Sequence, residues 1–272
     1  MRIEDLVALT LEEDIAFGDI TTRLTVPVGT EVEARIIAKT EGVLAGIDIA
    51  GEVFQQVDLS LDYIPLLADG TDLVYGSIIA GVQGSAAAIL TAERTALNFL
   101  QHLSGIATLT RAYVRASGGK IDILDTRKTT PLLRSLEKEA VRTGGGYNHR
   151  FGLFDGILIK DNHIRAAGGI EAAVTAARAG AQHLLKIEVE TQSLAQVEEA
   201  LAVEADIIML DNLSTGDMRR AIEIIGGRTQ VEISGGVTLE RIPELAALGA
   251  DFVSVGALTH SVKALDISLE IV

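Results

Sequence analysis

The sequence has no cysteine and no tryptophan, and aromatic residues make up only 4% of its 272 residues. Without cysteine the chain can form no disulfide framework, no thiolate nucleophile and no cysteine-ligated metal centre. The scarcity of aromatic side chains removes the stacking platforms that bind single-stranded nucleic acid. No stretch is long and apolar enough to span a membrane, and residues 1–5 are acidic too early for a targeting peptide. We therefore expect a cytoplasmic protein without a membrane or nucleic-acid partner.

A cationic block interrupts a chain whose formal net charge is -15. Residues 127–150 contain six basic residues and two glutamates. The basic residues are Arg127, Lys128, Arg134, Lys138, Arg142 and Arg150. This local reversal of charge indicates a site for a small polyanion, because the acidic remainder of the surface would repel a long phosphate backbone.

The pattern of hydrophobic residues changes near residue 120. Before it, β-like segments at 32–39 and 78–82 precede an amphipathic helix at 92–103, which Ser104-Gly105 is expected to end or bend. After it, short apolar runs alternate with helical patterns, which indicates parallel strands covered by helices. The runs are 121–124, 157–159, 184–189, 207–210, 231–233 and 252–255, and the helical patterns are 170–179, 194–202, 218–225 and 239–248.

Polar or glycine clusters follow every one of these predicted strands. Such clusters favour a barrel, whose strands all open onto one mouth, over an open sheet with a single switch point. The region after residue 120 is too short for eight ordinary strand–helix units. We therefore expect an incomplete α/β barrel preceded by a separate α/β domain.

Acidic side chains lie at two neighbouring strand ends. Lys186, Glu188 and Glu190 alternate along one predicted strand and so share a face, and Asp211 ends the next strand. For Lys186 and Glu188 a structural ion pair is the plainer interpretation. Glu190 and Asp211 together suit Mg²⁺, which binds a few carboxylates together with substrate phosphates.

Glycine-rich turns follow two late strands. Ser234-Gly235-Gly236 precedes a helix predicted near 238, and Gly256 follows the last strand. Unobstructed backbone N–H groups at such ends can cradle a phosphate, although either turn alone is common in any protein. His149 and Arg150 follow a glycine triplet and could grip a carboxylate, the alternative being a solvated loop. His102, His183 and His260 are interpreted as structural or capping residues, and no HExxH, GxSxG or Walker A motif is present.

Taken in order, these segments resemble the quinolinate phosphoribosyltransferases, the decarboxylating nicotinate-nucleotide pyrophosphorylases of de novo NAD synthesis. The resemblance covers nearly the whole chain and includes Thr-Arg-Lys-Thr-Thr-Pro at 126–131, Tyr-Asn-His-Arg at 147–150 and Lys-Asp-Asn-His at 160–163. The other matching segments are 13–22, 93–100, 103–108, 188–190, 210–212, 234–236 and 255–261. A family relative associated with molybdenum transport lacks the second and third of these patterns.

The resemblance implies an N-terminal α/β sandwich at 1–115, to which 262–272 can return, and an incomplete barrel of six or seven parallel strands at 116–261. It implies a pentosyl (glycosyl) transferase that moves the phosphoribosyl group of phosphoribosyl pyrophosphate to quinolinate. The products would be nicotinate mononucleotide, pyrophosphate and CO2, and Mg²⁺ would assist. It further implies a homodimer, or a hexamer of dimers, in which each site is completed by the neighbouring subunit.

The resemblance also implies a role for each candidate residue. Arg94 would reach into the neighbouring subunit's site to hold a quinolinate carboxylate. Within the chain, the dicarboxylate would be bound by Arg127, His149 and Arg150, and both substrates would be faced by Lys128 and Lys160. Glu190 and Asp211 would serve the ribose and Mg²⁺. The 5-phosphate would be held by Ser234, Gly235, Gly236 and Gly256.

One position departs from the family pattern, and two other functions remain open. Leu132 stands after Thr-Thr-Pro, where the family commonly has glycine. A related transferase acting on nicotinate is the first alternative, although the three guanidinium groups of Arg94, Arg127 and Arg150 suit two carboxylates better than one. A phosphate-binding sensor on a barrel is the second, and Lys128 and the two acidic residues disfavour it, because a binder needs no transition-state electrostatics.

Overall fold

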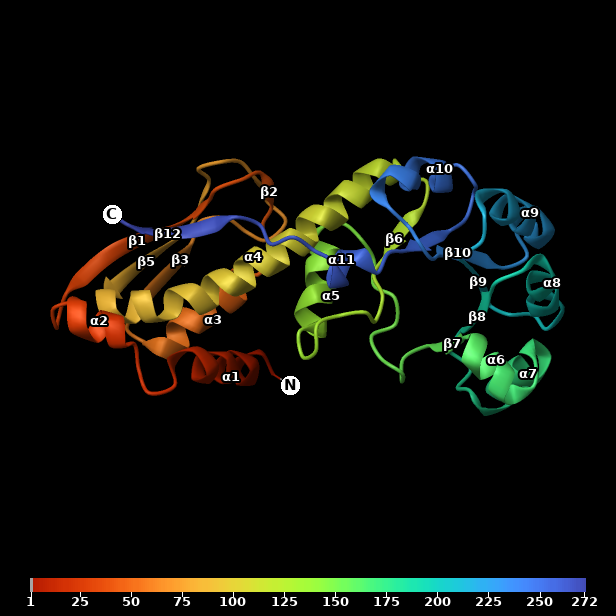
Figure 1. The fold of residues 1–272 in the computed structure, drawn as a ribbon, viewed down its shortest axis with the longest axis horizontal. Coiled ribbons are helices and arrows are strands. Elements are labelled where there is room, and N and C mark those ends of the chain that lie inside the picture. Colours follow the sequence, from red (N-terminus) through yellow and green to blue (C-terminus); the bar gives the residue numbers. More distant parts are fainter. Residues whose placement is uncertain (1) are drawn as a thin grey trace. The chain divides into compact units, whose positions relative to one another are not determined.

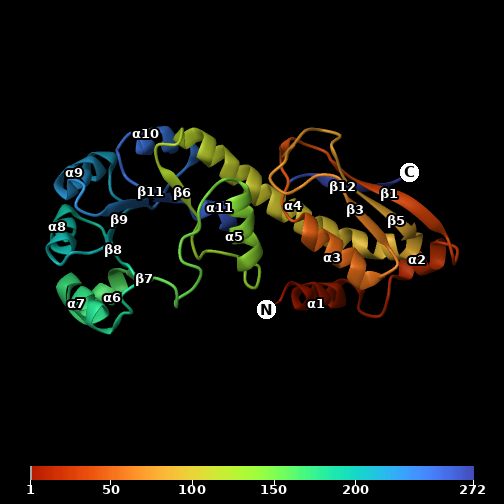
Figure 2. The ribbon, with the colours of Figure 1, turned by 180° about the vertical axis from the view of Figure 1, so that it is seen from behind.

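The computed structural model describes residues 2–272, which fold into two compact units (Figures 1 and 2). The first extends to Arg111 and also includes Thr130–Gly145 and Ser261–Val272. The second comprises Ala112–Thr129 and Gly146–His260. This division differs from the expected one at residues 112–115, which belong to the second unit, and at residues 130–145 and 261, which belong to the first. Among residues 2–272, no helix has the length and apolar character needed to cross a bilayer.

The first unit is built on a four-stranded antiparallel sheet in the order β12-β1-β5-β3. Alternate residues of β1 are buried, Ala34, Ile36 and Ala38 among them, as expected for a strand with one covered face. The strands of this unit are β1 (Glu31–Ala38), β2 (Gly42–Val43), β3 (Asp62–Pro65), β4 (Asp72–Leu73), β5 (Ile78–Ser85) and β12 (Ile267–Ile271). Its helices are α1 (Ile3–Ile15), α2 (Ile20–Thr25), α3 (Ile47–Val57), most of α4 (Ala86–Ser117) and α5 (Arg134–Thr143). In both views α3 and α4 run along one side of the sheet.

Helix α4 does not end or bend at Ser104-Gly105, so this prediction was wrong. Both residues serve close packing inside a continuous helix. The Ser104 hydroxyl accepts a hydrogen bond from the Ala45 N–H at 3.0 Å. A Cβ atom on Gly105 would lie 2.3 Å from the carbonyl oxygen of Lys263. The glycine therefore admits the returning C-terminal segment, at the modest cost of a glycine within a helix.

The second unit contains a six-stranded parallel sheet in the order β6-β11-β10-β9-β8-β7. Its strands are β6 (Asp122–Leu124), β7 (Ile157–Ile159), β8 (Ile187–Thr191), β9 (Ile207–Asp211), β10 (Gln230–Ser234) and β11 (Phe252–Ser254). Its helices are α6 (Asp161–Ala167), α7 (Ile170–Gly180), α8 (Leu194–Ala202), α9 (Thr215–Ile225), the 3₁₀ turn η1 (Leu239–Arg241), α10 (Ile242–Ala246) and α11 (Ala257–His260). Beyond β6, Tyr147 adds a single parallel bridge to Leu124. The sheet does not close between β6 and β7, which confirms the incomplete barrel.

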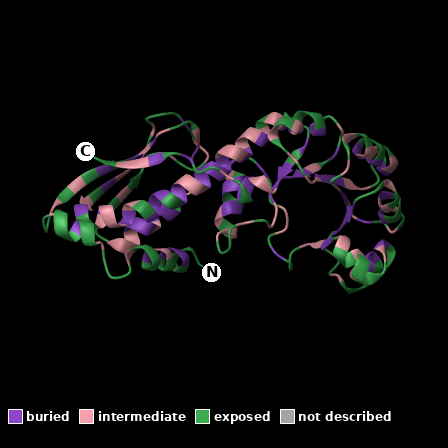
Figure 3. Cartoon of the chain, in the orientation of Figure 1, coloured by how far each residue is buried: buried purple, intermediate pink, exposed green. Residues whose placement is uncertain are grey.

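The parallel register brings the carboxyl ends of the strands to one edge. Asp211 at the end of β9 lies opposite Ser234 at the end of β10. Helices α7 to α10 cover the outside of the sheet in Figure 2, and its central strands are almost entirely buried in Figure 3. Along β8, Ile187 and Val189 share one face of the sheet, and Glu188 and Glu190 share the opposite face.

Candidate active site

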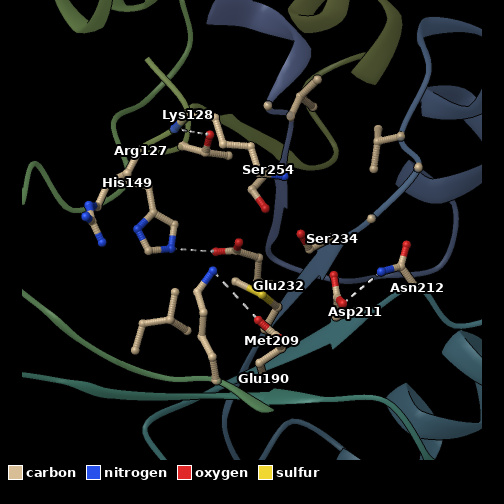
Figure 4. Close-up of a pocket in the computed structure, with 18 of the residues that line it drawn as sticks. Arg127, Lys128, His149, Glu190, Met209, Asp211, Asn212, Glu232, Ser234 and Ser254 are labelled. Carbon is tan, nitrogen blue, oxygen red and sulfur yellow. Dashed lines mark hydrogen bonds and ion pairs between the residues drawn. The ribbon is translucent and has the colours of Figure 1, made fainter. Parts of the chain in front are cut away.

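A cavity of about 510 Å³ opens at the carboxyl ends of the strands in the second unit. Figure 4 shows side chains from several of these strand ends converging on it. Eleven of the twelve predicted site residues line it: Arg127, Lys128, His149, Arg150, Lys160, Glu190, Asp211, Ser234, Gly235, Gly236 and Gly256. Residues from 127 to 256 in sequence thus form one site within a single unit.

Two guanidinium groups form the cationic part of the cavity. The Nε atoms of Arg127 and Arg150 are buried and have no hydrogen-bond partner. Burial, and then the charge of Arg127, lowers the pKa of Arg150. Arg150 Nη1 donates a hydrogen bond to the Gly156 carbonyl at 2.9 Å, which fixes one edge of the guanidinium. Two neighbouring cations with unused donors form a site that favours an anion with more than one carboxylate.

His149 is held in place by the strand end next to it. Asp125 is fully buried after β6, and its Oδ1 accepts the His149 N–H at 2.9 Å. His149 Nδ1 accepts the backbone N–H of Arg150 at 2.7 Å. The ring therefore carries its hydrogen on Nε2. Nε2 lies 3.1 Å from Glu188 Oε2 and 3.6 Å from Glu232 Oε2.

Lysine side chains reach the cavity from the ends of β6 and β7. Lys128 is exposed, and its carbonyl accepts the Thr259 hydroxyl at 2.8 Å, which ties the loop after β6 to α11. The Lys160 N–H donates to His163 Nδ1 at 2.9 Å, at the start of α6. Lys160 Nζ lies 3.9 Å from Glu190 Oε2. Both ammonium groups are thus positioned by local backbone contacts and remain accessible to a ligand.

Glu190 and Asp211 form the acidic part of the cavity. Burial, and then the charge of Asp211, raises the pKa of Glu190. Asp211 Oδ2 accepts a hydrogen bond from Asn212 Nδ2 at 2.8 Å. A cation between these two carboxylates would relieve their mutual repulsion, and oxygen ligands suit Mg²⁺. The residues therefore fit the divalent ion that the family resemblance implies.

The interpretation of Lys186 and Glu188 as an ion pair was wrong. Lys186 precedes β8, is exposed, and its Nζ donates to Gln230 Oε1 at 2.5 Å. Glu188 is instead buried against His149, with Glu232 of β10 beside it. Glu232 was missed from the sequence, although a single glutamate within the apolar run 231–233 was a signal that could have identified it.

The glycines at two strand ends keep the cavity open. Gly235 and Gly236 have φ values of +89° and +58°, which L side chains rarely adopt. A Cβ atom on Gly256 would lie 3.2 Å from Lys128 Cδ. The helix predicted at 239–248 is only the short η1 and α10, so any phosphate cradle here is formed by the loop. His260 also lines the cavity, which the sequence did not indicate.

Arg94 is the predicted site residue that does not line this cavity. It lies on α4 in the first unit, and its side chain is more than half exposed. Its Nη2 lies 4.0 Å from Glu93 Oε1. Its action in a neighbouring subunit stays a prediction.

Comparison with known proteins identifies the family. The N-terminal and C-terminal domain models of quinolinate phosphoribosyl transferase match residues 19–104 and 106–270. A probable nicotinate-nucleotide pyrophosphorylase [carboxylating] of Bacillus subtilis is 48% identical over 100% of this chain and 94% of its own length. A quinolinate phosphoribosyltransferase [decarboxylating] of Nicotiana tabacum is 44% identical over 99% and 82%. The crystal structure of NadC from Streptococcus pyogenes superposes with a TM-score of 0.94 at 45% identity, covering 99% of this chain and 97% of that one. The chain therefore belongs to the quinolinate phosphoribosyltransferase family.

Proposed function

We propose that the protein transfers the phosphoribosyl group of phosphoribosyl pyrophosphate to quinolinate and releases CO2, giving nicotinate mononucleotide and pyrophosphate for NAD synthesis. The observation that carries this proposal is the composition of one cavity. Paired guanidinium groups at Arg127 and Arg150 face the same space as the carboxylates Glu190 and Asp211 and the glycine loop after β10. A dicarboxylate acceptor and a phosphorylated sugar donor can therefore occupy the cavity together.

The residues support a reaction at ribose C1. Departure of pyrophosphate builds positive charge on the sugar and negative charge on the leaving group. Glu190 and Asp211 would stabilise the sugar cation, and Lys128 and Lys160 would stabilise the pyrophosphate. Mg²⁺ held by Glu190 and Asp211 would neutralise charge on the phosphates. Fixing the pyridine nitrogen in line with C1 would supply much of the remaining rate enhancement.

The acceptor side favours a substrate with two carboxylates. Arg127 and Arg150 each keep a buried Nε without a partner, so the site can offer a guanidinium group to each of two carboxylates. Nicotinate carries a single carboxylate and would engage fewer of these donors. Discrimination between the two acids therefore follows from the unused donors rather than from the size of the cavity.

The proposal extends to a homodimer or a hexamer of dimers and to a cytoplasmic location. The exposed position of Arg94 supports a role for this guanidinium in the site of a second subunit. Both substrates are highly charged and do not cross membranes unaided, which supports a cytoplasmic enzyme.

A product assay tests the proposed activity. The protein is incubated with Mg²⁺, phosphoribosyl pyrophosphate and either quinolinate or nicotinate, and nicotinate mononucleotide and CO2 are measured. We expect both products from quinolinate and little nucleotide from nicotinate. Product from nicotinate alone would contradict the proposal.

A further inference from the structure

A buried pair of glutamates lies beneath the part of the cavity formed by His149. Glu188 and Glu232 are 5% and 2% exposed, and Oε1 of each is buried without a hydrogen-bond partner. Ligand atoms of these two carboxylates and of His149 lie within 4.8 Å of one another. Two carboxylates so close and so deeply buried are costly to ionise together. One of them is therefore expected to hold a proton.

The contacts of His149 distinguish the two glutamates. Its Nε2 lies 3.1 Å from Glu188 Oε2 and 3.6 Å from Glu232 Oε2, so Glu188 is the nearer acceptor for the Nε2 hydrogen. Burial, and then the charge of Glu188, raises the pKa of Glu232 well above its ordinary value, and Ser254 and Lys160 oppose this shift more weakly. The same three side chains have the spacing of a metal site. The positive charges of Arg150 and Lys160, which act on Glu188 and Glu232 respectively, oppose a dication there more strongly than a proton.

The order of the strands places Glu232 between the two halves of the cavity. Glu232 lines the cavity from β10, which lies between β6 and β8 in the sheet. Arg127, for the carboxylates, follows β6, and Glu190, for the ribose, lies on β8. Figure 4 shows Glu232 near the centre of the labelled residues, directed toward His149. A pyridine ring held at one side by its carboxylates and at the other by its bond to ribose would therefore lie over Glu232.

We propose that Glu232 is the acid that protonates the pyridine C2 atom after CO2 has left. This inference rests on the proposed function. In quinolinate, C2 carries the carboxylate that is lost, and it lies between the ring nitrogen and C3, which carries the other carboxylate. The bond from C2 to its carboxylate breaks, CO2 departs, and the electron pair stays on C2 beside the cationic nitrogen. The O–H bond of Glu232 then breaks and a C–H bond forms at C2. Glu232 becomes a carboxylate and regains its proton from water in the open cavity.

The isotope composition of the product tests this proton donor. In a mixture of equal H2O and D2O, a carboxylic acid with one sheltered hydrogen passes on the isotope it holds. Water and a lysine ammonium group choose among two or three hydrogens and deliver protium preferentially. We expect nicotinate mononucleotide from the unaltered enzyme to carry hydrogen and deuterium at C2 in nearly the ratio of the solvent. A clear excess of protium would overturn the proposal.

Variants separate proton donation from a structural role. Glu232→Gln removes the acidic hydrogen with little change of shape, and we expect kcat to fall about 10²-fold, with an excess of protium at C2. The KM for phosphoribosyl pyrophosphate should not change, and Glu232→Asp should restore the ratio of the solvent. Glu223→Gln, at an exposed position of α9, is the matched control. An isotope ratio in Glu232→Gln equal to that of the unaltered enzyme would exclude Glu232 as the donor. Absence of any product from quinolinate with the unaltered enzyme would instead refute the proposed function.

Discussion

A Cβ atom on Gly235 would lie 2.2 Å from Asn212 Oδ1 and 2.8 Å from the Asn212 backbone nitrogen. Both residues have left-handed backbone conformations, with φ of +55° at Asn212 and +89° at Gly235. The Asn212 N–H donates to the Ser234 carbonyl at 3.0 Å. The ends of β9 and β10 are thereby held together at the edge of the cavity, and position 235 admits no side chain.

Gly235→Ala should impair binding of the sugar phosphate more than it impairs folding. The added methyl group must displace Asn212 or the loop, and we expect the KM for phosphoribosyl pyrophosphate to rise at least about tenfold, equivalent to about 1.4 kcal/mol. Gly227→Ala is the control, because Gly227 has a φ of +73° and open space around it. Steady-state kinetics of both variants make the comparison. An equal KM in the two would contradict a phosphate role for this loop.

Leu132 is expected to cost the protein stability. Its φ is +69°, a conformation in which glycine is relaxed and leucine is strained by about 1–2 kcal/mol. Leu132→Gly should raise the free energy of unfolding by up to about 1 kcal/mol, because the greater flexibility of glycine offsets part of the gain. Leu132→Val should lower it. Urea denaturation measures both changes, and a less stable glycine variant would show that the strain is absent.

The pH dependence of stability should report the raised pKa of Glu232. In the unfolded chain this carboxyl ionises near pH 4.3, whereas in the native protein it holds its proton to higher pH. Above pH 4.3 the native state therefore binds more protons than the unfolded state, and the stability due to this group is lost as pH rises, by up to about 1.4 kcal/mol per pH unit. Glu232→Gln cannot ionise and should be more stable than the unaltered protein at pH 7, with no difference below about pH 4. Denaturation curves at a series of pH values for the unaltered protein, Glu232→Gln and the control Glu223→Gln make the comparison. Parallel profiles of stability against pH for the unaltered protein and Glu232→Gln would refute this prediction.

Removal of Mg²⁺ should abolish turnover. We expect EDTA to stop the reaction and added Mg²⁺ to restore it, because without a cation the Glu190 and Asp211 carboxylates would repel the substrate phosphates. Asp211→Asn should raise the Mg²⁺ concentration for half-maximal activity at least about tenfold. Substitutions of residues around a bound metal typically lower its affinity by at least this factor. Glu244→Gln, on the exposed side of α10, is the control. Full activity of the protein in EDTA would contradict the proposed cofactor.

Mixed subunits test the proposed role of Arg94 across an interface. Arg94→Ala and Lys128→Ala homo-oligomers should each be inactive. After exchange of subunits, some sites would combine an intact Lys128 with an intact Arg94 from the neighbouring subunit, so part of the activity should return. Native mass spectrometry verifies the exchange. No recovery in verified mixed oligomers would indicate that Arg94 does not act in this way.

Most strands and helices of the second unit could be predicted because they are amphipathic or apolar over their whole length. Helix α8 was predicted with the bounds that it has, and the six apolar runs all correspond to strands. Helix α5 was not predicted because its sequence, Arg134–Thr143, is dominated by charged residues. The early end of α4 was predicted because glycine usually marks a break, whereas Gly105 marks a close approach to a segment more than 150 residues away.

The sequence by itself determined the fold class, the family and the set of charged residues, because strand–helix alternation and residue type are local properties. Only the tertiary structure decided how those charges are partnered. Lys186 was paired with Glu188 from their spacing, yet it contacts Gln230, and Glu188 meets His149 and Glu232. Contacts of this kind depend on which strands are neighbours and on how much water is excluded. The raised pKa of Glu232 follows from both, and neither is encoded in the spacing of residues along one segment.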